Sequence, residues 1–417
     1  MRTLRLILLY IFAVVIVVIL GGFVGWYFFL HVPQTNTEAI DTARGLGLPK
    51  GSFTGGSTQK NIGTIVGSGP EDVSTSTAPK SPLWHVDTTP VAGMGFVKHA
   101  TSTALHYVER ANGFVFMANP APRSVTRITE TLMPKIYEAF ISSDGAVIER
   151  SLNDAGAITT FMATVGATTS KASTSTEQNM LLGTYIEKDI LQIAPSPTAR
   201  SIFYIVRNAA GGVDGMTAQW NGSKAKKIFS STITHWLPQW LSDGRLIITE
   251  SPADDLPGYG YRVGDDGSMT LLVGNVPGLS LLPRASSKAL VYSSSSGGML
   301  TLFTQGAASS TPTALDLHTI ADKCVWYEGR SLIAYCAVPS SPTSGTFLND
   351  WYRGAVHTTD EWWKIDIQNG AIMQIYSPKK SDGVNTDVER PIIDPSGNYI
   401  AFINASDKSL WMLKIPQ

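Results

Sequence analysis

Short apolar runs separated by turn residues make up most of the chain after residue 83. The runs are rich in Val, Ile, Tyr, Phe and Thr, and Gly, Asp, Asn, Ser and Pro stand between them. The apolar positions do not recur with the period of an amphipathic helix of ordinary length. Strands at this spacing are typical of an all-β sandwich, barrel or propeller.

Repetition of similar blocks favours the propeller, because a four-stranded blade takes about forty residues. Seven strand pairs recur, and each is preceded by a shorter apolar run. The pairs are Ala104–Glu109 with Phe114–Asn119, Ala146–Leu152 with Ala157–Val165, Ser201–Arg207 with Met216–Trp220, Arg245–Glu250 with Tyr259–Gly264, Lys288–Ser293 with Met299–Thr304, Ser331–Val338 with Glu361–Ile367, and Asn398–Asn404 with Ser409–Ile415. We therefore predict an all-β propeller of seven four-stranded blades. Six blades is the alternative, because the second block is irregular and carries the Thr/Ser-rich insertion Thr164–Gln178.

The last block ends at Gln417 without a fourth strand, whereas Leu83–Val86 stands unassigned ahead of the first block. Placing this apolar run beside Ser409–Ile415 would close the ring and remove two open sheet edges. We therefore predict that the propeller comprises residues 83–417 and that Leu83–Val86 is its closing strand.

The N-terminus has a different pattern, a continuous apolar run over residues 6–30 without Asp, Glu, Lys, Arg or His. One helix of this length can cross a bilayer. Arg2 and Arg5 precede the run and the next Lys or Arg is Arg44, so the positive-inside rule places residues 1–5 in the cytoplasm. We predict a single-pass membrane anchor with everything after it outside the cytoplasm; a cleaved signal peptide is the alternative.

Residues 31–82 are dominated by Gly, Ser, Thr and Pro and contain few large apolar side chains. Such a segment buries too little surface to offset its ordering entropy. We predict a flexible stalk between the anchor and the propeller.

The two cysteines fall in adjacent strand-like runs, Lys323–Tyr327 and Ser331–Val338. A hairpin centred on Arg330 places Cys324 and Cys336 opposite each other, and opposed residues of an antiparallel pair lie about 4.5–5.5 Å apart. We predict a disulfide between them in an oxidising compartment; two buried free thiols are the alternative.

The C-terminal block resembles the repeat of TolB-like and WD40-like propellers. It has an Asp-Pro-Ser-Gly turn at Asp394–Gly397, an apolar strand, and a second strand at Leu410–Leu413. Similar turns occur at Ser143–Gly145, Ser242–Gly244 and Asp265–Gly267. The resemblance covers residues 91–417 as a fold and implies no activity.

A second resemblance rests on the segments Lys323–Tyr327, Ala334–Pro339, Asn349–Gly354 and Glu361–Asp366. Together they are similar to a family of uncharacterised membrane-anchored propeller proteins of candidate-phyla bacteria. This resemblance implies no activity either.

Motifs of nucleophilic, zinc and nucleotide chemistry are absent, since the chain has no Gly-x-Ser-x-Gly, His-Glu-x-x-His, Gly-x-x-x-x-Gly-Lys or Cys-x-x-Cys. The seven histidines are His31, His85, His99, His106, His235, His318 and His357. No two of them have the spacing of metal ligands on one short element. Asp254-Asp255 and Asp265-Asp266 lack the alternating ligands of a calcium loop. We predict no catalytic residues, metal or cofactor. The net charge of -1 also argues against nucleic acid as a partner.

The long connection Pro339–Asp360 is the strongest candidate for a binding site, because loops of this length are usually functional or disordered. Trp, Tyr and Arg often anchor interfaces. The candidate binding residues are Phe347, Asp350, Trp351, Tyr352, Arg353 and His357. This loop should share a face with Ser251–Gly258 and Asn208–Asp214, and that face is the predicted binding surface. In the alternative, Trp351 and Tyr352 cover the rim of their own blade.

Two classes of function are consistent with these features. We predict a binding or scaffolding module of the cell envelope, whose partner is another envelope protein or cell-wall glycan. The alternative is a hydrolase or lyase with a site of Asp, His and Arg side chains at the axial funnel. Carboxylates and histidines converging there with strongly shifted pKa values would favour the enzyme.

Overall fold

The computed structural model describes residues 81–416 except 100–101, 155, 168–178, 187–188, 198–199, 309–310 and 344. The predicted cytoplasmic end, the membrane anchor at residues 6–30 and the stalk up to residue 80 lie outside the described residues. Within the described part, no helix is both long enough and apolar enough to cross a membrane.

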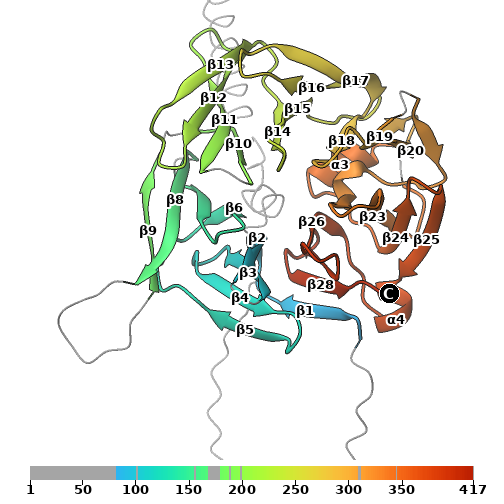
Figure 1. Cartoon of the computed structure of the whole chain (residues 1–417), viewed down its shortest axis with the longest axis horizontal. Helices are drawn as coiled ribbons and strands as arrows, with labels where there is room; N and C mark the ends of the chain where they lie inside the picture. Colours follow the sequence, from blue (N-terminus) through green and yellow to red (C-terminus); the bar gives the residue numbers. More distant parts are fainter. Residues whose placement is uncertain are drawn as a thin grey trace, which may run out of the picture. The chain divides into compact units, whose positions relative to one another are not determined.

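The folded unit is a β-propeller of seven blades, each a four-stranded antiparallel sheet (Figure 1). Blades 1 to 3 comprise β2 (Val91–Lys98), β3 (Thr103–Glu109), β4 (Val115–Asn119) and β5 (Ser124–Arg127); β6 (Ile136–Ile141), β7 (Val147–Leu152), β8 (Ile158–Ala167) and β9 (Asn179–Tyr185); and β10 (Gln192–Pro195), β11 (Ser201–Arg207), β12 (Val213–Gln219) and β13 (Lys226–Ser231). Blades 4 to 6 comprise β14 (Trp236–Trp240), β15 (Leu246–Glu250), β16 (Pro257–Val263) and β17 (Met269–Pro277); β18 (Ser280–Pro283), β19 (Leu290–Ser296), β20 (Met299–Gln305) and β21 (Thr313–Leu315); and β22 (Cys324–Tyr327), β23 (Ile333–Pro339), β24 (Asp360–Asp366) and β25 (Ala371–Tyr376). Blade 7 joins β26 (Val388–Ile393), β27 (Tyr399–Asn404) and β28 (Leu410–Lys414) to β1 (Leu83–Asp87), and the short helices are η1 (Ala321–Lys323), α3 (Phe347–Tyr352) and α4 (Pro378–Asp382).

The predicted count of seven blades is confirmed, and each predicted strand pair forms the second and third strands of a blade. The six-blade alternative is wrong. The insertion predicted to begin at Thr164 starts later, because β8 continues to Ala167 and pairs with β9 as far as Asn179. The rest of that insertion lies outside the described residues.

The ring closes through the predicted pairing of the N-terminal strand with the C-terminal strand. Leu83 pairs with Leu413, and His85 pairs with Trp411. The His85 ring also stacks on the Trp411 indole with the ring centroids 3.9 Å apart. The first and last described strands therefore belong to one sheet.

Every blade follows the same path, so its loops fall into two sets. Loops between the second and third strands, and the connections between blades, emerge at one end of the ring, which we call the upper face. Loops between the first and second strands, and between the third and fourth, emerge at the lower face. The Pro339–Asp360 connection joins β23 to β24 and therefore lies on the upper face.

Adjacent blades pack face to face through apolar clusters, and two glycines allow blades 1 and 2 to approach closely at the axis. A Cβ atom on Gly93 would lie 1.9 Å from the carbonyl oxygen of Ala139, and one on Gly95 would lie 2.4 Å from that of Ile141. Because both obstacles are backbone atoms, a side chain at either glycine would force β2 away from β6.

The predicted disulfide is confirmed. Cys324 and Cys336 occupy directly paired positions of β22 and β23 and are covalently joined. Both are buried in an apolar cluster that includes Val291 and Leu302 of blade 5. The bond therefore joins the two inner strands of blade 6 at a point where they pack against blade 5.

One buried carboxyl group lacks a partner. Glu149 of β7 lies opposite Ala139 of β6, is 1% exposed, and neither of its oxygens has a hydrogen-bond partner among the described residues. Burial raises the pKa of Glu149 to about 8, so the group is mainly protonated at neutral pH.

This carboxyl group should make stability fall as the pH rises. The folded protein binds the Glu149 proton more tightly than the unfolded chain, so the loss begins near the usual pKa of 4.5 and levels off near 8, at up to about 1.4 kcal/mol per pH unit. Between pH 5 and pH 7, Glu149→Gln should lose about 2.5 kcal/mol less unfolding free energy than the wild type in urea unfolding. The control is Asp316→Asn, whose side chain is fully exposed. If the free energy of unfolding changed with pH equally in the wild type and in Glu149→Gln, this prediction would be wrong.

Candidate functional site

The predicted binding loop folds into helix α3, which lies across the upper face over blade 5 (Figure 1). Phe347, Leu348 and Trp351 form the buried side of the helix and pack against Leu300 and Ile320. These contacts are with blade 5 and the connection that follows it, not with the rim of the helix's own blade.

The remaining candidate residues of the loop lie toward solvent. Tyr352 is 38% exposed, and the side chains of Arg353 and His357 are 70% and 39% exposed. Arg353 forms an ion pair with Asp350 on the same helix, and this guanidinium together with the Thr346 hydroxyl lowers the pKa of Asp350. The loop thus divides into apolar residues that hold it in place and polar residues that a partner can reach.

Aspartates of neighbouring blades hold α3 in place. The Asn349 N–H donates to Asp254 Oδ2 at 2.9 Å, and the Asp254 N–H donates back to Asn349 Oδ1 at 3.2 Å. The Ser295 hydroxyl donates to the other oxygen of Asp254 at 2.6 Å. The Asp255 carboxylate accepts the N–H of Gly297 at 2.7 Å. Loops of blades 4, 5 and 6 are therefore joined into one continuous surface.

A second set of hydrogen bonds fixes the C-terminal end of α3. The Tyr352 hydroxyl donates to Asp322 Oδ2 at 2.6 Å, and the Ser280 hydroxyl donates to Asp322 Oδ1 at 2.5 Å. Desolvation of the hydroxyl group and the Asp322 charge together raise the pKa of Tyr352 well above its usual value, although part of the ring stays exposed. The phenol therefore stays protonated and acts as a hydrogen-bond donor.

Below α3 lies a buried ionic cluster centred on Lys323. Its ammonium group is fully buried and donates to Asp360 Oδ2 at 2.6 Å, Asp387 Oδ1 at 2.5 Å and Thr358 Oγ1 at 2.8 Å. It also lies 4.9 Å from the centroid of the Trp351 ring. All three donor positions of the ammonium group are used.

Asp387 is the acceptor that links this cluster to the long loop. It accepts hydrogen bonds from Trp351 Nε1 and His357 Nδ1, each at 2.9 Å. Burial alone would raise the pKa of Asp387, but Lys323 and these donors outweigh it and hold the pKa below its usual value. Burial raises the pKa of Asp360 despite Lys323. The cluster is therefore built to hold the loop, with His357 as its solvent-facing member.

A further ionic network reaches from blade 7 to blade 2 past blade 1. Arg390 stands in a β-bulge of β26 with φ of 50°, and its guanidinium bonds to Glu138 of β6. The buried Arg150 bonds to the other oxygen of Glu138. Burial would raise the pKa of Glu138, but the two guanidinium groups lower it. Lys408 pairs with Glu389, whose pKa is also lowered against the effect of burial.

The ionic clusters around Lys323 and Arg390 show whether their carboxyl groups could serve the alternative function, a hydrolase or lyase. Glu138, Glu389 and Asp387 are paired with Lys or Arg and stay ionised, so none of them is set up as a proton donor. The described residues contain no group of three or more His, Cys, Asp or Glu that could hold a metal ion.

Exposed apolar side chains are unevenly distributed over the described part of the propeller. One group lies on the outer strands: Val125, Leu182, Tyr185, Met269, Leu271, Ile372 and Met373. The other lies at the upper face, with Leu132, Ile233 and Leu256 in its loops, Met299 as the first residue of β20 and Tyr352 as the last residue of α3. No large exposed apolar side chain lies in the described lower-face loops.

Leu256, Met299 and Tyr352 lie in or directly beside the three loops that Asp254 and Asp255 join, and the first two are each 63% exposed. Together with the connection at residues 316–323, these upper-face segments carry five aspartates, one arginine and the buried Lys323; the aspartates and the arginine are Asp254, Asp255, Asp316, Asp322, Asp350 and Arg353. We call this set of apolar and charged residues the acidic–apolar surface.

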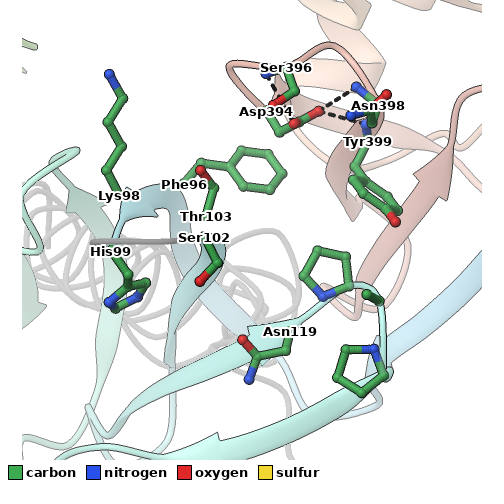
Figure 2. A pocket seen from close by; sticks show the side chains of 13 residues that line it. Phe96, Lys98, His99, Ser102, Thr103, Asn119, Asp394, Ser396, Asn398 and Tyr399 are labelled. Carbon is green, nitrogen blue, oxygen red and sulfur yellow. Dashed lines mark hydrogen bonds between the residues drawn. The ribbon is translucent and has the colours of Figure 1, made fainter.

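The lower face has a hollow of about 540 Å³ between blades 7 and 1 (Figure 2). Phe96 and Tyr399 line it from opposite sides, with Lys98 and Asn119 at its edge. Asp394 accepts three hydrogen bonds from backbone N–H groups of its own turn. The Asp-Pro-Ser-Gly motif therefore has a structural role, since its carboxylate is used to form the turn.

No family model matches the sequence, and no curated protein matches it. Among solved structures, the chain is similar to TolB from Acinetobacter baumannii, at 12% identity over 78% of this chain and 79% of that chain, with a TM-score of 0.40. It is also similar to the tricorn protease, at 11% identity over 81% of this chain and 34% of that chain, with a TM-score of 0.48. A third similar structure is the β-propeller domain of the Trilobed protease from Pyrococcus furiosus, at 9% identity over 78% of this chain and 95% of that chain, with a TM-score of 0.48.

These similarities agree with the propeller fold and extend no further. The propeller fold that the resemblance to TolB-like and WD40-like propellers implies is confirmed by the seven four-stranded sheets. The resemblance to membrane-anchored propellers of candidate-phyla bacteria stays a prediction.

Proposed function

We propose that this protein is a binding or scaffolding module of the cell envelope, and that it binds another envelope protein through the acidic–apolar surface. The observation that carries the proposal is the joining of three loops from different blades into one surface that leaves Leu256 and Met299 exposed. Exposed apolar groups on fixed loops, surrounded by polar ones, mark interaction sites.

The fixed loops support binding because a preorganised surface loses little entropy when a partner docks. Asp254, Asp322 and Asp387 each bond to α3 or its loop from a different part of the ring. Tyr352 and Arg353 are thereby held toward solvent, and these residue types frequently dominate binding energy.

The charge of the surface indicates the chemistry of the partner. Five aspartates against one arginine favour a partner segment that carries Lys or Arg beside apolar side chains. A polysaccharide without cationic groups would not match this charge. We therefore place the envelope protein ahead of cell-wall glycan as the partner.

The proposed location rests on the N-terminal sequence and on the disulfide. The apolar run at residues 6–30 would anchor the chain in the membrane, and residues 31–82 would hold the propeller away from it, outside the cytoplasm. The Cys324–Cys336 disulfide supports an oxidising compartment. The alternative hydrolase or lyase function is supported by one observation, the hydrogen bond of the exposed His357 to Asp387.

The test is site-specific photo-crosslinking in intact cells, with the crosslinker at Met299 or, as a matched control, at Met373 on the outer strand β25, where the side chain is 55% exposed. We expect crosslinking at Met299 to one protein species, which Leu256→Glu reduces at least tenfold and Met373→Glu leaves unchanged. Higher salt should weaken the interaction. Equal crosslinking from both positions, or retention by purified cell-wall glycan alone, would overturn the proposal.

A further inference from the structure

Two histidines meet at the lower face of blade 1. His99 follows β2 and His106 lies on β3, so the hairpin between these strands brings the two imidazoles together. Their Nε2 atoms are 3.3 Å apart, and the ring centroids are 5.4 Å apart with the planes tilted by 40°. Their separation of seven residues in sequence gave no sign of this contact.

The 3.3 Å between the two nitrogens is at the long end of hydrogen-bond distances. The same separation also matches two ligands of one metal ion. Two nitrogens that each lie 2.0–2.1 Å from a tetrahedral ion are about 3.3–3.4 Å apart. The imidazoles therefore already have the spacing that two ligands of one ion require.

The surroundings of the pair suit an open site. His106 is only 5% exposed and is held within β3, opposite Gly95 of β2 and Met117 of β4. His99 is exposed and lies at the edge of the Figure 2 hollow. One ligand would thus be fixed by the blade, while the other faces solvent and leaves room for water or a small ligand.

We propose that His99 and His106 together bind one transition-metal ion of the kind that prefers imidazole, such as Zn²⁺ or Cu²⁺, with its remaining positions open to solvent. The site is independent of the acidic–apolar surface, which lies on the other face of the ring. Two protein ligands give an exchangeable site rather than a closed structural one.

The test is titration of the purified, metal-free, full-length protein with Zn²⁺ or Cu²⁺ by calorimetry. We expect saturation at one ion per chain, tighter binding of Cu²⁺ than of Zn²⁺, and at least tenfold weaker binding in His99→Gln and in His106→Gln. The exposed His99 makes the cleaner variant, because it leaves the buried position intact. His318→Gln on the upper face is the control and should bind as the wild type does.

Paramagnetic resonance of the Cu²⁺ form provides a second measurement. We expect two imidazole nitrogens on the ion in the wild type and one in His99→Gln. Absence of saturable binding, or binding that His99→Gln leaves unchanged, would overturn the proposal and leave the pair as a hydrogen bond between two imidazoles.

Discussion

Removal of strand β1 is expected to destabilise the whole propeller rather than blade 7 alone. The strand joins the two ends of the chain, so its loss opens the ring and exposes the edge of β28. It also removes the buried side chains of Leu83 and Val86, each worth about 1.5–3 kcal/mol. We therefore expect a chain that begins at Val91 to lose about 3–6 kcal/mol in unfolding free energy relative to one that begins at Lys80.

Chemical unfolding followed by fluorescence and by circular dichroism would measure this difference. Both probes should shift together, because closure stabilises the ring as a unit. The shortened chain should also self-associate, since an open edge next to Trp411 can pair with another chain. Equal stability of the two chains, with both monomeric, would show that the ring does not depend on β1.

Replacement of Lys323 by methionine is expected to lower the free energy of unfolding almost as much as removal of β1. It would leave Asp360 and Asp387 buried without their cation, and breaking a buried ion pair by removing one partner costs about 3–5 kcal/mol. Lys379→Met, at an exposed position of α4, should cost little and serves as the control.

The pH dependence separates this charge effect from a packing defect. In the wild type, Lys323 helps to hold the pKa of Asp387 down, so this contribution to stability is present above the usual pKa of the carboxyl group and is lost as the pH falls. Without Lys323, protonation of the two aspartates at low pH should relieve the penalty. The difference in unfolding free energy between the wild type and Lys323→Met, measured in urea, should therefore become smaller as the pH is lowered from 7 to 4. A constant difference would point to lost packing instead.

Several residues of the candidate site have a role in the structure that differs from the one their sequence suggests. The sequence offers Asp254 and Asp255 as possible cation ligands and as part of the predicted surface segment Ser251–Gly258, and the structure uses them to join three loops. The sequence predicts that Trp351 either meets a partner or covers its own blade; in the structure its buried ring packs with Leu300 and Ile320 and donates a hydrogen bond to Asp387. A helix as short as α3 has too few residues for its period to be read from the sequence.

The sequence by itself determined the local architecture of this protein. Alternating apolar strands, turn residues and the forty-residue repeat predicted the strand pairs of every blade, the closing strand and the Cys324–Cys336 pairing. These features depend on neighbours along the chain or, for closure, on a simple count of strands. Each could be inferred because a hairpin register follows from the turn at its centre.

Only the tertiary structure decided which charged side chains meet. Lys323 reaches Asp387 over 64 residues, and Arg390 reaches Glu138 over 252 residues. Such contacts depend on the rotation from one blade to the next and on the bulge that turns Arg390 toward blade 2, and neither follows from a repeat pattern. A buried charge is stable only beside a partner of opposite charge. Which residue lies beside it depends on the geometry of the closed ring, which no local stretch of sequence specifies.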